Sequence, residues 1–469
     1  MAEHGNAEPP SSDYLENRTF DELAMDESAT LVRELTERDI QLFAAMSGDI
    51  NPAHLDEEFA REEIFHEIVA HGMWAGSLFS NLLGTQLPGP GTIYLAQDLK
   101  FLKPICLGDT VTVTVTVAEK RPEKKQVIFD CRCTNQRGDL TISGQARVLA
   151  PTQKIRRRKT ELPEVYLHRK GAQLERFIEQ SIPREPVRMA IVHPTDSLSL
   201  LAAVRAADVG LVEPVLVGPR ERIQQAAATA KVDLGDYEIV DSAHSHDSAE
   251  QAVALVRSGH VQALMKGKLP TDELMGAVGR MDGGLRTERQ LSHVFMMDVP
   301  RYPRPLLVTD AVINVAPTLA DKVDIVQNAI DLGIATGIDQ PRVAILCARE
   351  IVDAKVACTL DASALCKMAE RGQIVGGLVD GPLAFDNALD TNAARARGIQ
   401  SAVAGEADVL VAPDLEAANM LARQLESVAD AKGGGVVMGA RVPIALTSRF
   451  VDELTRLASC AMAVNVHQY

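Results

Sequence analysis

The order of apolar and polar residues in the first third of the chain predicts one long helix followed by several strands. Residues 72–84 contain no charged side chain, which favours a helix that is buried on all sides. Residues 110–117 read TVTVTVTV, and this strict alternation is typical of a strand with one buried face. The segments 92–101, 126–135 and 140–149 also have strand character. We therefore expect an α+β domain in which a curved antiparallel sheet wraps the helix.

From residue 187 onward, short apolar segments alternate with helical sequence. Residues 188–193 and 214–218 are predicted strands, and the amphipathic helix between them has its cap near Asp196. Further segments have the same character: 261–267, 305–311, 342–348, 374–380 and 408–414. This alternation predicts an α/β domain with a mostly parallel sheet covered on both faces, and we expect it to have two lobes. Ligand-binding side chains are then expected beyond the carboxyl ends of the strands.

The loop before the apolar helix carries the strongest chemical signal of the chain. Residues 47–54 read SGDINPAH, in which Asn51 fits a helix N-cap and Pro52 fits the first helical position. Asp49 then lies on the loop and His54 in the first helical turn. A carboxylate and an imidazole placed in this way can act on one water molecule as an acid/base pair. The alternative is a helix cap with a histidine nearby by chance.

Residues 30–150 resemble the MaoC-like (R)-specific enoyl-CoA hydratases, which have the hot-dog fold. The resemblance is carried by FAAMSGDINPAHLDEEFA, by IVAHGMWAGSLFSNLLGTQLPGPGTIYLAQDLKFLKP and by the LGDTVTV strand. It implies that Asp49 and His54 are the catalytic pair and that water adds reversibly to a trans-2-enoyl-CoA, giving the (R)-3-hydroxyacyl-CoA. It also implies that the amide of Gly72 holds the thioester carbonyl, and free amides at a helix start do favour developing negative charge. A homo-oligomer built on dimers is a further implication.

Polar segments follow several predicted strands in the second half. KGKLPTDEL, from Lys266 onward, places two lysines and a helix start after a strand, which is an anion site by geometry. The GxxxxGK[ST] and GxGxxG patterns are absent there and at the first unit, so neither a P-loop nor dinucleotide binding is expected. The other segments are GGLRTERQLSHVFMM at 283–297, VTDAVINVAP at 308–317 and GARVPIALTSR at 439–449.

Together with VDGPLAFDNAL and DVLVAPDLEAANML, these segments resemble the phosphate acetyltransferase and phosphate butyryltransferase family over residues 165–469. The resemblance implies reversible acyl transfer between acyl-CoA and inorganic phosphate. Ser448 and Arg449 match the family's Ser-Arg pair, and Arg286 matches another substrate-binding arginine. Arginine suits this task because its planar fork binds phosphate oxygens in a bidentate way. Ser448 is expected to hydrogen-bond the developing charge.

Two aspartates and a lysine are further candidates in the transferase half. Lys266 is expected to bind phosphate or CoA. The family has an aspartate beyond its Ser-Arg pair, but here Asp452 stands at a different spacing, so it is either a general base or a carboxylate at a helix start. Asp310 is expected to hold a loop of the pocket in place.

The length of 469 residues allows two or three domains. We expect a disordered tail at 1–14, the hot-dog domain at 15–150, a linker at 151–165 and the acyltransferase domain at 166–469. We interpret the basic run RRRK as a linker segment in contact with solvent. The alternative is that its charges attract the phosphates of CoA locally. Because the formal net charge is -16, nucleic acid is not an expected partner.

Membrane, disulfide and metal chemistry have little support in the sequence. No stretch approaches ~18 apolar residues, and no basic start precedes an apolar core, so we expect no membrane partner and a cytoplasmic protein. The seven cysteines are scattered, which favours reduced thiols. His71 is expected to line the pocket or to be structural, and no metal site is predicted, because no second His or Cys lies at ligand spacing.

The sequence therefore predicts a bifunctional enzyme, a hydratase joined to a phosphate acyltransferase. Its substrates would be CoA thioesters and inorganic phosphate, with no tightly bound cofactor. One alternative is a phosphate acetyl- or butyryltransferase whose hot-dog domain is a non-catalytic acyl-CoA sensor or dimerisation module. Another is a hot-dog thioesterase. An NAD-linked dehydrogenase is disfavoured by the missing glycine fingerprint.

Overall fold

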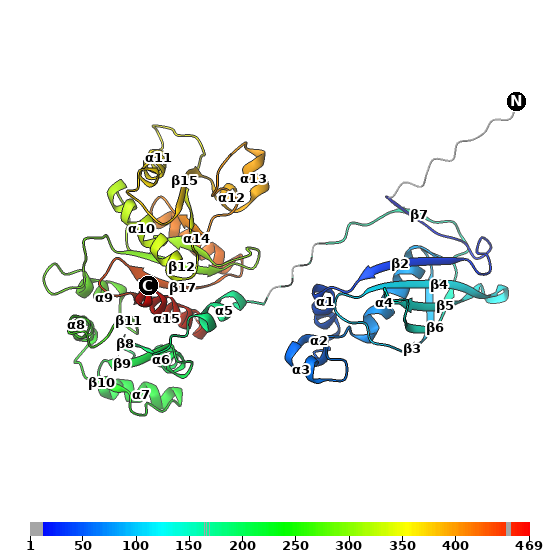
Figure 1. Cartoon of the computed structure of the whole chain (residues 1–469), viewed down its shortest axis with the longest axis horizontal. Coiled ribbons are helices and arrows are strands. Elements are labelled where there is room, and N and C mark those ends of the chain that lie inside the picture. The colour runs from blue at the N-terminus through cyan, green and yellow to red at the C-terminus, as the bar shows by residue number, and fades with distance from the viewer. Residues whose placement is uncertain (1–12, 164, 166, 168, 447–451) are drawn as a thin grey trace. The chain divides into compact units, whose positions relative to one another are not determined.

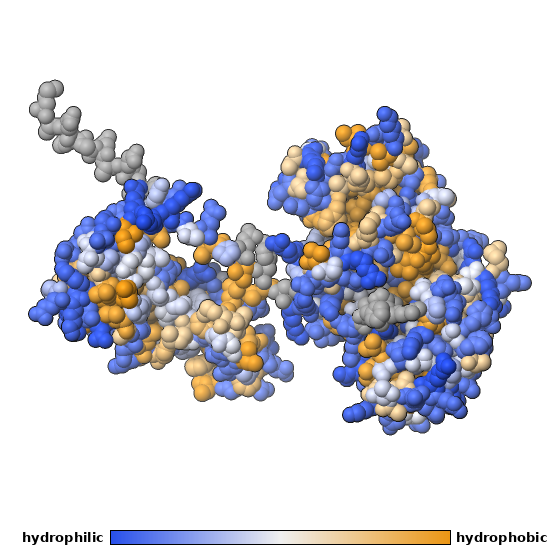
Figure 2. Space-filling model, turned by 180° about the vertical axis from the view of Figure 1, so that it is seen from behind, coloured by the Kyte–Doolittle hydropathy of each residue, from blue (hydrophilic) through white to orange (hydrophobic). Residues whose placement is uncertain are grey.

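The computed structural model describes residues 13–163, 165, 167, 169–446 and 452–469. The chain divides into two compact units, residues 1–167 and 168–469, which are described separately (Figure 1). Both units have a largely hydrophilic surface on the face shown in Figure 2, interrupted by apolar areas. No helix of the described residues is long and apolar enough to cross a membrane. All seven cysteines are free thiols.

The first unit has the predicted hot-dog architecture. Its antiparallel sheet has the order β2-β4-β5-β6-β3 and packs on the long helix α4 (Gly72–Thr85). The strands are β2 (Ser28–Glu34), β3 (Ile93–Phe101), β4 (Thr110–Arg121), β5 (Gln126–Thr134) and β6 (Leu140–Leu149), with a short 3-10 helix, η1 (Pro122–Lys124), between β4 and β5. The alternation predicted in β4 is confirmed, since every valine from Val111 to Val117 is fully buried and every threonine between them is only partly so.

The prediction that α4 is buried on all sides is wrong for the single chain. Phe79, Leu82 and Leu83 are fully buried against the sheet, but Met73 is 56% exposed. The sheet covers only one side of the helix, and the other side carries small uncharged residues: Ser77, Ser80, Asn81 and Gly84. The sequence has no charge on that side, so the pattern alone did not distinguish it from the buried face.

Short helices position the loop that carries the SGDINPAH motif. Helix α1 (Glu37–Ser47) begins with a capping box at Thr36 and ends at Gly48, whose φ of 76° suits a glycine. Helix α2 (Pro52–Leu55) is followed directly by α3 (Glu57–Glu62). The motif therefore turns sharply between two helix ends.

The expected linker is partly built into the first unit. Strand β7 (Arg156–Arg158) pairs antiparallel with β1 (Tyr14–Glu16). The amide of Ile155 also donates to Oδ1 of Asn17 at 2.9 Å. The basic run thus lies in an edge strand, where charged side chains are common, and the expected linker bounds of 151–165 stay a prediction.

The second unit contains one sheet of the order β10-β9-β8-β11-β18-β17-β12-β13-β16-β14-β15. The neighbours in the group β10-β9-β8-β11-β18 pair in parallel, and so do the neighbours in the group β13-β16-β14-β15. Strands β17 and β12 lie between the two groups and pair antiparallel with their neighbours. This confirms the mostly parallel, two-lobed α/β prediction. The strands are β8 (Val187–Val192), β9 (Val212–Val217), β10 (Glu238–Val240), β11 (Ala263–Lys266), β12 (Ser292–Asp298), β13 (Leu306–Thr309), β14 (Arg342–Leu346), β15 (Leu378–Leu383), β16 (Val409–Val411), β17 (Lys432–Met438) and β18 (Ile444–Ala445).

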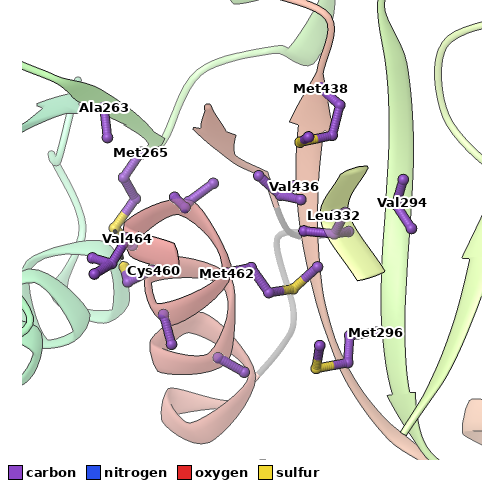
Figure 3. Packing of buried hydrophobic residues seen from close by; sticks show 14 of the residues in the cluster. Ala263, Met265, Val294, Met296, Leu332, Val436, Met438, Cys460, Met462 and Val464 are labelled. Carbon is purple, nitrogen blue, oxygen red and sulfur yellow. Dashed lines mark hydrogen bonds between the residues drawn. The ribbon is translucent and has the colours of Figure 1, made fainter. Parts of the chain in front are cut away.

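Helices cover the sheet of the second unit, and the C-terminal helix lies in its core. They are α5 (Ala172–Gln180), α6 (Ser197–Asp208), α7 (Arg220–Ala230), α8 (Ser245–Arg257), α9 (Thr271–Val278), α10 (Leu319–Ala335), α11 (Ala357–Glu370), α12 (Phe385–Leu389), α13 (Thr391–Ala396), α14 (Leu415–Ser427) and α15 (Glu453–Gln468). Figure 3 shows Cys460 and Val464 of α15 beside Met265 of β11, while Met462 points toward β17 and β12. Helix α15 packs against β11 and β18 of the first strand group and against β17, which joins the two groups.

Candidate functional site

The motif loop of the first unit forms as the sequence predicts. Oδ1 of Asn51 accepts a hydrogen bond from the amide of Ala53 at 3.2 Å, and Pro52 is the first residue of α2. His54 lies in this single turn, and Asp49 is exposed on the loop before it. The N-cap and the proline therefore fix the distance between the carboxylate and the imidazole.

Two backbone carbonyls orient the histidines of this site. Nδ1 of His54 donates to the carbonyl of Val69 at 2.8 Å, because a carbonyl can only accept. Nε2 of His71 donates to the carbonyl of Asp49 at 3.0 Å. In the neutral form, Nε2 of His54 then carries the lone pair, which is the arrangement a general base requires.

Asp49, His54 and His71 converge on one point. A carboxylate oxygen of Asp49 and one ring nitrogen of each histidine all lie within 4.8 Å of one another. Two hydrogen bonds of ~2.8 Å can span such a distance, so one water molecule can contact the carboxylate and an imidazole together. The imidazole rings of His54 and His71 lie 4.0 Å apart, centroid to centroid.

The sequence places no second His or Cys at ligand spacing from His71, but the fold brings His54 next to it. His71 is 2% exposed, and its Nδ1 has no hydrogen-bond partner among the described residues. Two imidazoles and a carboxylate are donors that a zinc-type ion accepts. Because 17 positions separate His54 and His71 in the sequence, their closeness in the fold could not be predicted. That the site works without a metal stays a prediction.

An apolar cavity begins at the start of α4. Gly72 is the first residue of the helix, so its amide has no acceptor within the helix. The cavity has a volume of about 270 Å³ and is lined by Gly72, His71 and apolar side chains that include Phe65, Phe101 and Ile142. A carbonyl placed at the amide of Gly72 would have its apolar chain in this cavity. The sequence predicted the amide but not the residues of the cavity.

In the second unit, the two lysines of KGKLPTDEL have different environments. Lys266 is the last residue of β11 and only 5% exposed, whereas Lys268 is exposed and lines a cavity. That Lys266 binds phosphate or CoA stays a prediction, and its side chain is buried in this structure.

The GLRT segment and the segment before the Ser-Arg pair lie side by side. Arg286 forms an isolated antiparallel bridge with Ala440, and Oγ1 of Thr287 donates to the carbonyl of Gly439 at 2.7 Å. Arg286 is exposed, and Nη1 contacts Sδ of Met281 at 3.7 Å. Ser448 and Arg449 lie outside the described residues. The structure nevertheless brings Arg286 next to the segment that leads into them.

Asp452 caps a helix. Its carboxylate accepts from the amide of Thr455 at 3.1 Å and pairs with Lys432. Burial alone would raise the pKa of Asp452, but the hydrogen bonds from Lys432 and Thr455 outweigh it and lower that pKa. This environment fits the helix-start alternative better than the general-base role.

Asp310 and His293 are two buried side chains of the second unit that lie close enough to interact electrostatically. Asp310 is 4% exposed and accepts from the amides of Val312, Ile313 and Asn314 at 3.0–3.1 Å, so it holds this loop in place as expected. Nε2 of His293 donates to the carbonyl of Leu446 at 3.1 Å, and complete burial lowers the pKa of His293. The sequence alone does not predict the contact of His293 with Leu446, because 153 positions separate the two residues.

Comparisons with known proteins divide the chain in the same way. A sequence model described as "MaoC like domain" matches residues 22–134, and one described as "Phosphate acetyl/butaryl transferase" matches residues 244–464. A phosphate acetyltransferase of Rhizobium meliloti is 55% identical over 289 residues, which are 62% of this chain and 92% of the relative. A branched-chain phosphotransacylase structure from Enterococcus faecalis is 26% identical, with a TM-score of 0.54, over 60% of this chain and 99% of its own. The unliganded R-hydratase PhaJ1 of Pseudomonas aeruginosa is 43% identical, with a TM-score of 0.32, over 33% of this chain and 99% of its own.

Proposed function

Because the chain belongs to the phosphate acetyl/butyryltransferase family and carries a MaoC-like domain ahead of its transferase domain, we propose that it is a bifunctional enzyme of CoA thioesters. The second unit transfers an acyl group between acyl-CoA and phosphate. The first unit adds water reversibly to a trans-2-enoyl-CoA. Acyl-CoA and phosphate are the substrates, and neither reaction needs a tightly bound cofactor.

In the transfer reaction, a phosphate oxygen attacks the thioester carbonyl, the C–S bond breaks, and CoA leaves as the thiolate. Arg286 and Arg449 hold the phosphate dianion through charge-assisted hydrogen bonds. Ser448 donates to the oxygen on which negative charge develops. The adjacency of Arg286 and the segment at Gly439 and Ala440 supports placing these groups in one site.

For hydration, the observation that carries the proposal is the convergence of Asp49 and His54 on one point. The pair removes a proton from the water that attacks the β carbon and returns a proton to the α carbon. The amide of Gly72 stabilises the enolate-like oxygen, where one such donor is worth ~10²-fold or more in rate. The cavity beyond Gly72 holds the acyl chain.

The two alternatives for the first unit make different demands on these residues. A sensor or dimerisation module has no need for an imidazole oriented by the carbonyl of Val69 beside an exposed carboxylate. A thioesterase would also use water and a carboxylate, but its water attacks the thioester carbonyl and releases CoA. The two reactions are therefore distinguished by whether free thiol appears.

Acyl transfer is tested by giving the full chain acetyl-CoA or butyryl-CoA with inorganic phosphate. We expect free CoA and acyl phosphate in equal amounts, both strictly dependent on phosphate. CoA release that is independent of phosphate, or no release with either acyl group, would contradict the transferase assignment. Comparison of the two acyl-CoA substrates decides between acetyl and butyryl preference.

We also infer that two copies of the first unit pair through the edge strand β3. Ile93 and Phe101 of this strand are 55% and 54% exposed, and β3 is at the end of the sheet with one backbone edge unpaired there. A second copy that pairs along this edge would cover these exposed apolar side chains. Light scattering on residues 1–167 should give twice the fragment mass, and Ile93→Lys should lower it toward the monomer. A monomeric unsubstituted fragment would contradict the pairing.

A further inference from the structure

Two cysteines of the second unit lie against each other, although they are 11 positions apart in the sequence. Cys347 is the first residue after β14, and Cys358 is the second residue of α11, which packs against β14 and β15. Cys347 is part of one apolar cluster of this unit, and Cys358 packs against the same cluster. The two thiols are joined by a hydrogen bond. The fold therefore forms a pair of thiols that the spacing in the sequence does not reveal.

The two thiols of the pair have different environments. Cys347 is 7% exposed, whereas Cys358 is only partly buried. Burial raises the pKa of Cys347, and the hydrogen bond with Cys358 raises that pKa further. Cys347 therefore keeps its proton and donates it to the sulfur of Cys358. Of the two thiols, Cys358 is the one that solvent reaches more easily.

The start of α11 favours negative charge at Cys358. Among the described residues, this helix has no side-chain cap, and its first turn contains no acidic residue, so its positive end is not neutralised there. The two carboxylates nearest in the sequence are engaged in ion pairs, Asp361 with Lys322 at 2.8 Å and Asp353 with Arg349 at 2.9 Å. Partly exposed cysteines at helix starts are reactive, because the thiolate is the nucleophile.

Backbone hydrogen bonds hold the segments that carry the two cysteines. The amide of Cys347 donates to the carbonyl of Leu383 on β15 at 2.8 Å. Between the cysteines, the amide of Asp353 donates to Oγ1 of Thr359 at 2.9 Å, which ties the connecting loop to the first turn of α11. The carboxylate of Asp353 accepts from the amide of Lys355 at 2.9 Å in the same loop. The folded backbone therefore keeps the two thiols together.

A cavity gives small molecules access to Cys347. The cavity has a volume of about 700 Å³ and is lined by Cys347 together with mostly apolar side chains, among them Leu346, Phe385 and Leu421. A neutral molecule enters an apolar space at a far lower desolvation cost than an ion does. Cys347 is thus within reach of a small uncharged oxidant, although it is largely buried.

A third thiol on the same helix is placed differently. Cys366 lies about two turns beyond Cys358 on α11, and its Sγ donates to the carbonyl of Gly381 at 3.4 Å. Burial raises the pKa of Cys366 to about 12. Cys366 therefore stays protonated and engaged, and it serves as a control within the same element.

We propose that Cys347 and Cys358 form a reversible oxidation site, at which hydrogen peroxide converts the two thiols into one disulfide. The thiolate of Cys358 attacks one oxygen of the peroxide, the O–O bond breaks, and the leaving hydroxide takes up a proton to give water. Cys358 is then a sulfenic acid. The sulfur of Cys347 attacks that of Cys358, the S–S bond forms, the S–O bond breaks, and a second water leaves with the proton of Cys347. The pair takes part in neither of the two proposed reactions of CoA thioesters.

The experiment treats the full chain with hydrogen peroxide, blocks the remaining thiols with iodoacetamide and digests the unreduced protein with trypsin. Trypsin cuts after Arg349 and Lys355, so the two cysteines fall in separate peptides, 343–349 and 356–367. In mass spectrometry we expect these peptides joined, with the loss of two hydrogen atoms, and separated again by dithiothreitol. Because peptide 356–367 also contains Cys366, Cys366→Ser is the matched control and should give the same joined product.

Two further variants test the roles of the two thiols. In Cys347→Ser, peroxide should leave Cys358 as a sulfenic acid that dimedone traps, because no second thiol resolves it. In Cys358→Ser, Cys347 should stay a free thiol, since a protonated buried thiol is a poor nucleophile. Circular dichroism checks that each variant is folded. If Cys347→Ser does not fold, Cys358→Ser at the more exposed position still provides the test.

Three results would overturn the proposal. The first is that the two peptides of the unsubstituted chain stay separate after peroxide treatment. The second is a joined product that disappears in Cys366→Ser, which would assign the disulfide to Cys366. The third is oxidation of Cys347 in Cys358→Ser as fast as in the unsubstituted chain, which would show that Cys358 is not the thiol that reacts first.

Discussion

At the scale of single residues, the hydration site depends on how the backbone orients two imidazoles. The carbonyl of Val69 fixes the tautomer of His54, and Nε2 of His71 holds the loop at the carbonyl of Asp49. The carboxylate of Asp49 remains exposed and accepts only a weak 3.2 Å contact from the amide of Asn51. Within the described residues, the other carboxylate oxygen of Asp49 makes no hydrogen bond, so it is open to a water molecule.

Asp49→Asn and His54→Ala should each lower crotonyl-CoA hydration by ~10²-fold or more, because general acid–base catalysis contributes this much. The double variant should be little slower than either single variant, since groups that act as a unit are non-additive. The rate of enone disappearance measures the effect. Asp56→Asn is the matched control, because Asp56 caps α3 nearby and asparagine caps equally well. Near-normal hydration in both single variants would remove the pair from the mechanism.

Arg286→Gln and Arg449→Gln should weaken the use of phosphate in the transfer reaction far more than the binding of acyl-CoA. A charge-assisted hydrogen bond is worth roughly 1.5–3 kcal/mol, so the KM for phosphate or the turnover should suffer by more than about tenfold. Initial rates at varied phosphate concentration measure this. Arg176→Gln on α5 serves as the charge-matched control. Unchanged phosphate kinetics in Arg449→Gln would show that this arginine is structural.

At the scale of secondary structure, Asp452 connects the region after the Ser-Arg segment to the core helix α15. Asp452→Ala removes the cap and the ion pair with Lys432, whereas Asp452→Asn keeps a good N-cap and removes only the ion pair. We expect the alanine variant to lose about 1 kcal/mol of unfolding free energy and the asparagine variant to lose less. Transfer activity of the folded asparagine variant should be nearly unchanged. A large loss of kcat in it would restore the general-base role.

The stability difference should depend on pH in one direction. The pKa of Asp452 is lower in the folded chain than its usual value, so its ionised form stabilises the fold above the unfolded pKa of ~3.9. This contribution is lost as the pH falls through the folded pKa. Denaturant unfolding at decreasing pH should therefore show the asparagine variant approaching the unsubstituted protein. A gap that is constant with pH would contradict the ion-pair account.

Patterns among neighbouring residues predicted most helices and strands, and the elements and contacts that they did not predict have physical causes. The cap at Asn51 and the alternation in β4 depend on adjacent residues, so the sequence predicted both correctly. Strand β17 was missed because its KGGGVVM sequence suggests a loop. Its glycines are needed for close packing, since a Cβ at Gly435 would lie 2.5 Å from Nε2 of His293. The contact between His54 and His71 was missed for a different reason, because only the tertiary fold creates it.

At the scale of the whole molecule, the chain divides after residue 167. Fragments 1–167 and 168–469 should each fold, with hydration in the first and acyl phosphate formation in the second. A fragment that ends at residue 152 lacks β7 and its pairing with β1, so it should melt at a lower temperature than fragment 1–167. Circular dichroism and the two activity assays measure these outcomes. Two folded fragments of which one becomes active only after mixing would show that the units share a site.

The central claim is that one chain hydrates enoyl-CoA in addition to transferring acyl groups. The most direct test is to incubate the full chain with crotonyl-CoA in the absence of phosphate and to identify the product by chiral analysis, together with free thiol. The account predicts (R)-3-hydroxybutyryl-CoA and no released CoA, with the product absent in Asp49→Asn. Unchanged crotonyl-CoA from a preparation that transfers acetyl groups to phosphate, or released CoA without phosphate, would contradict it.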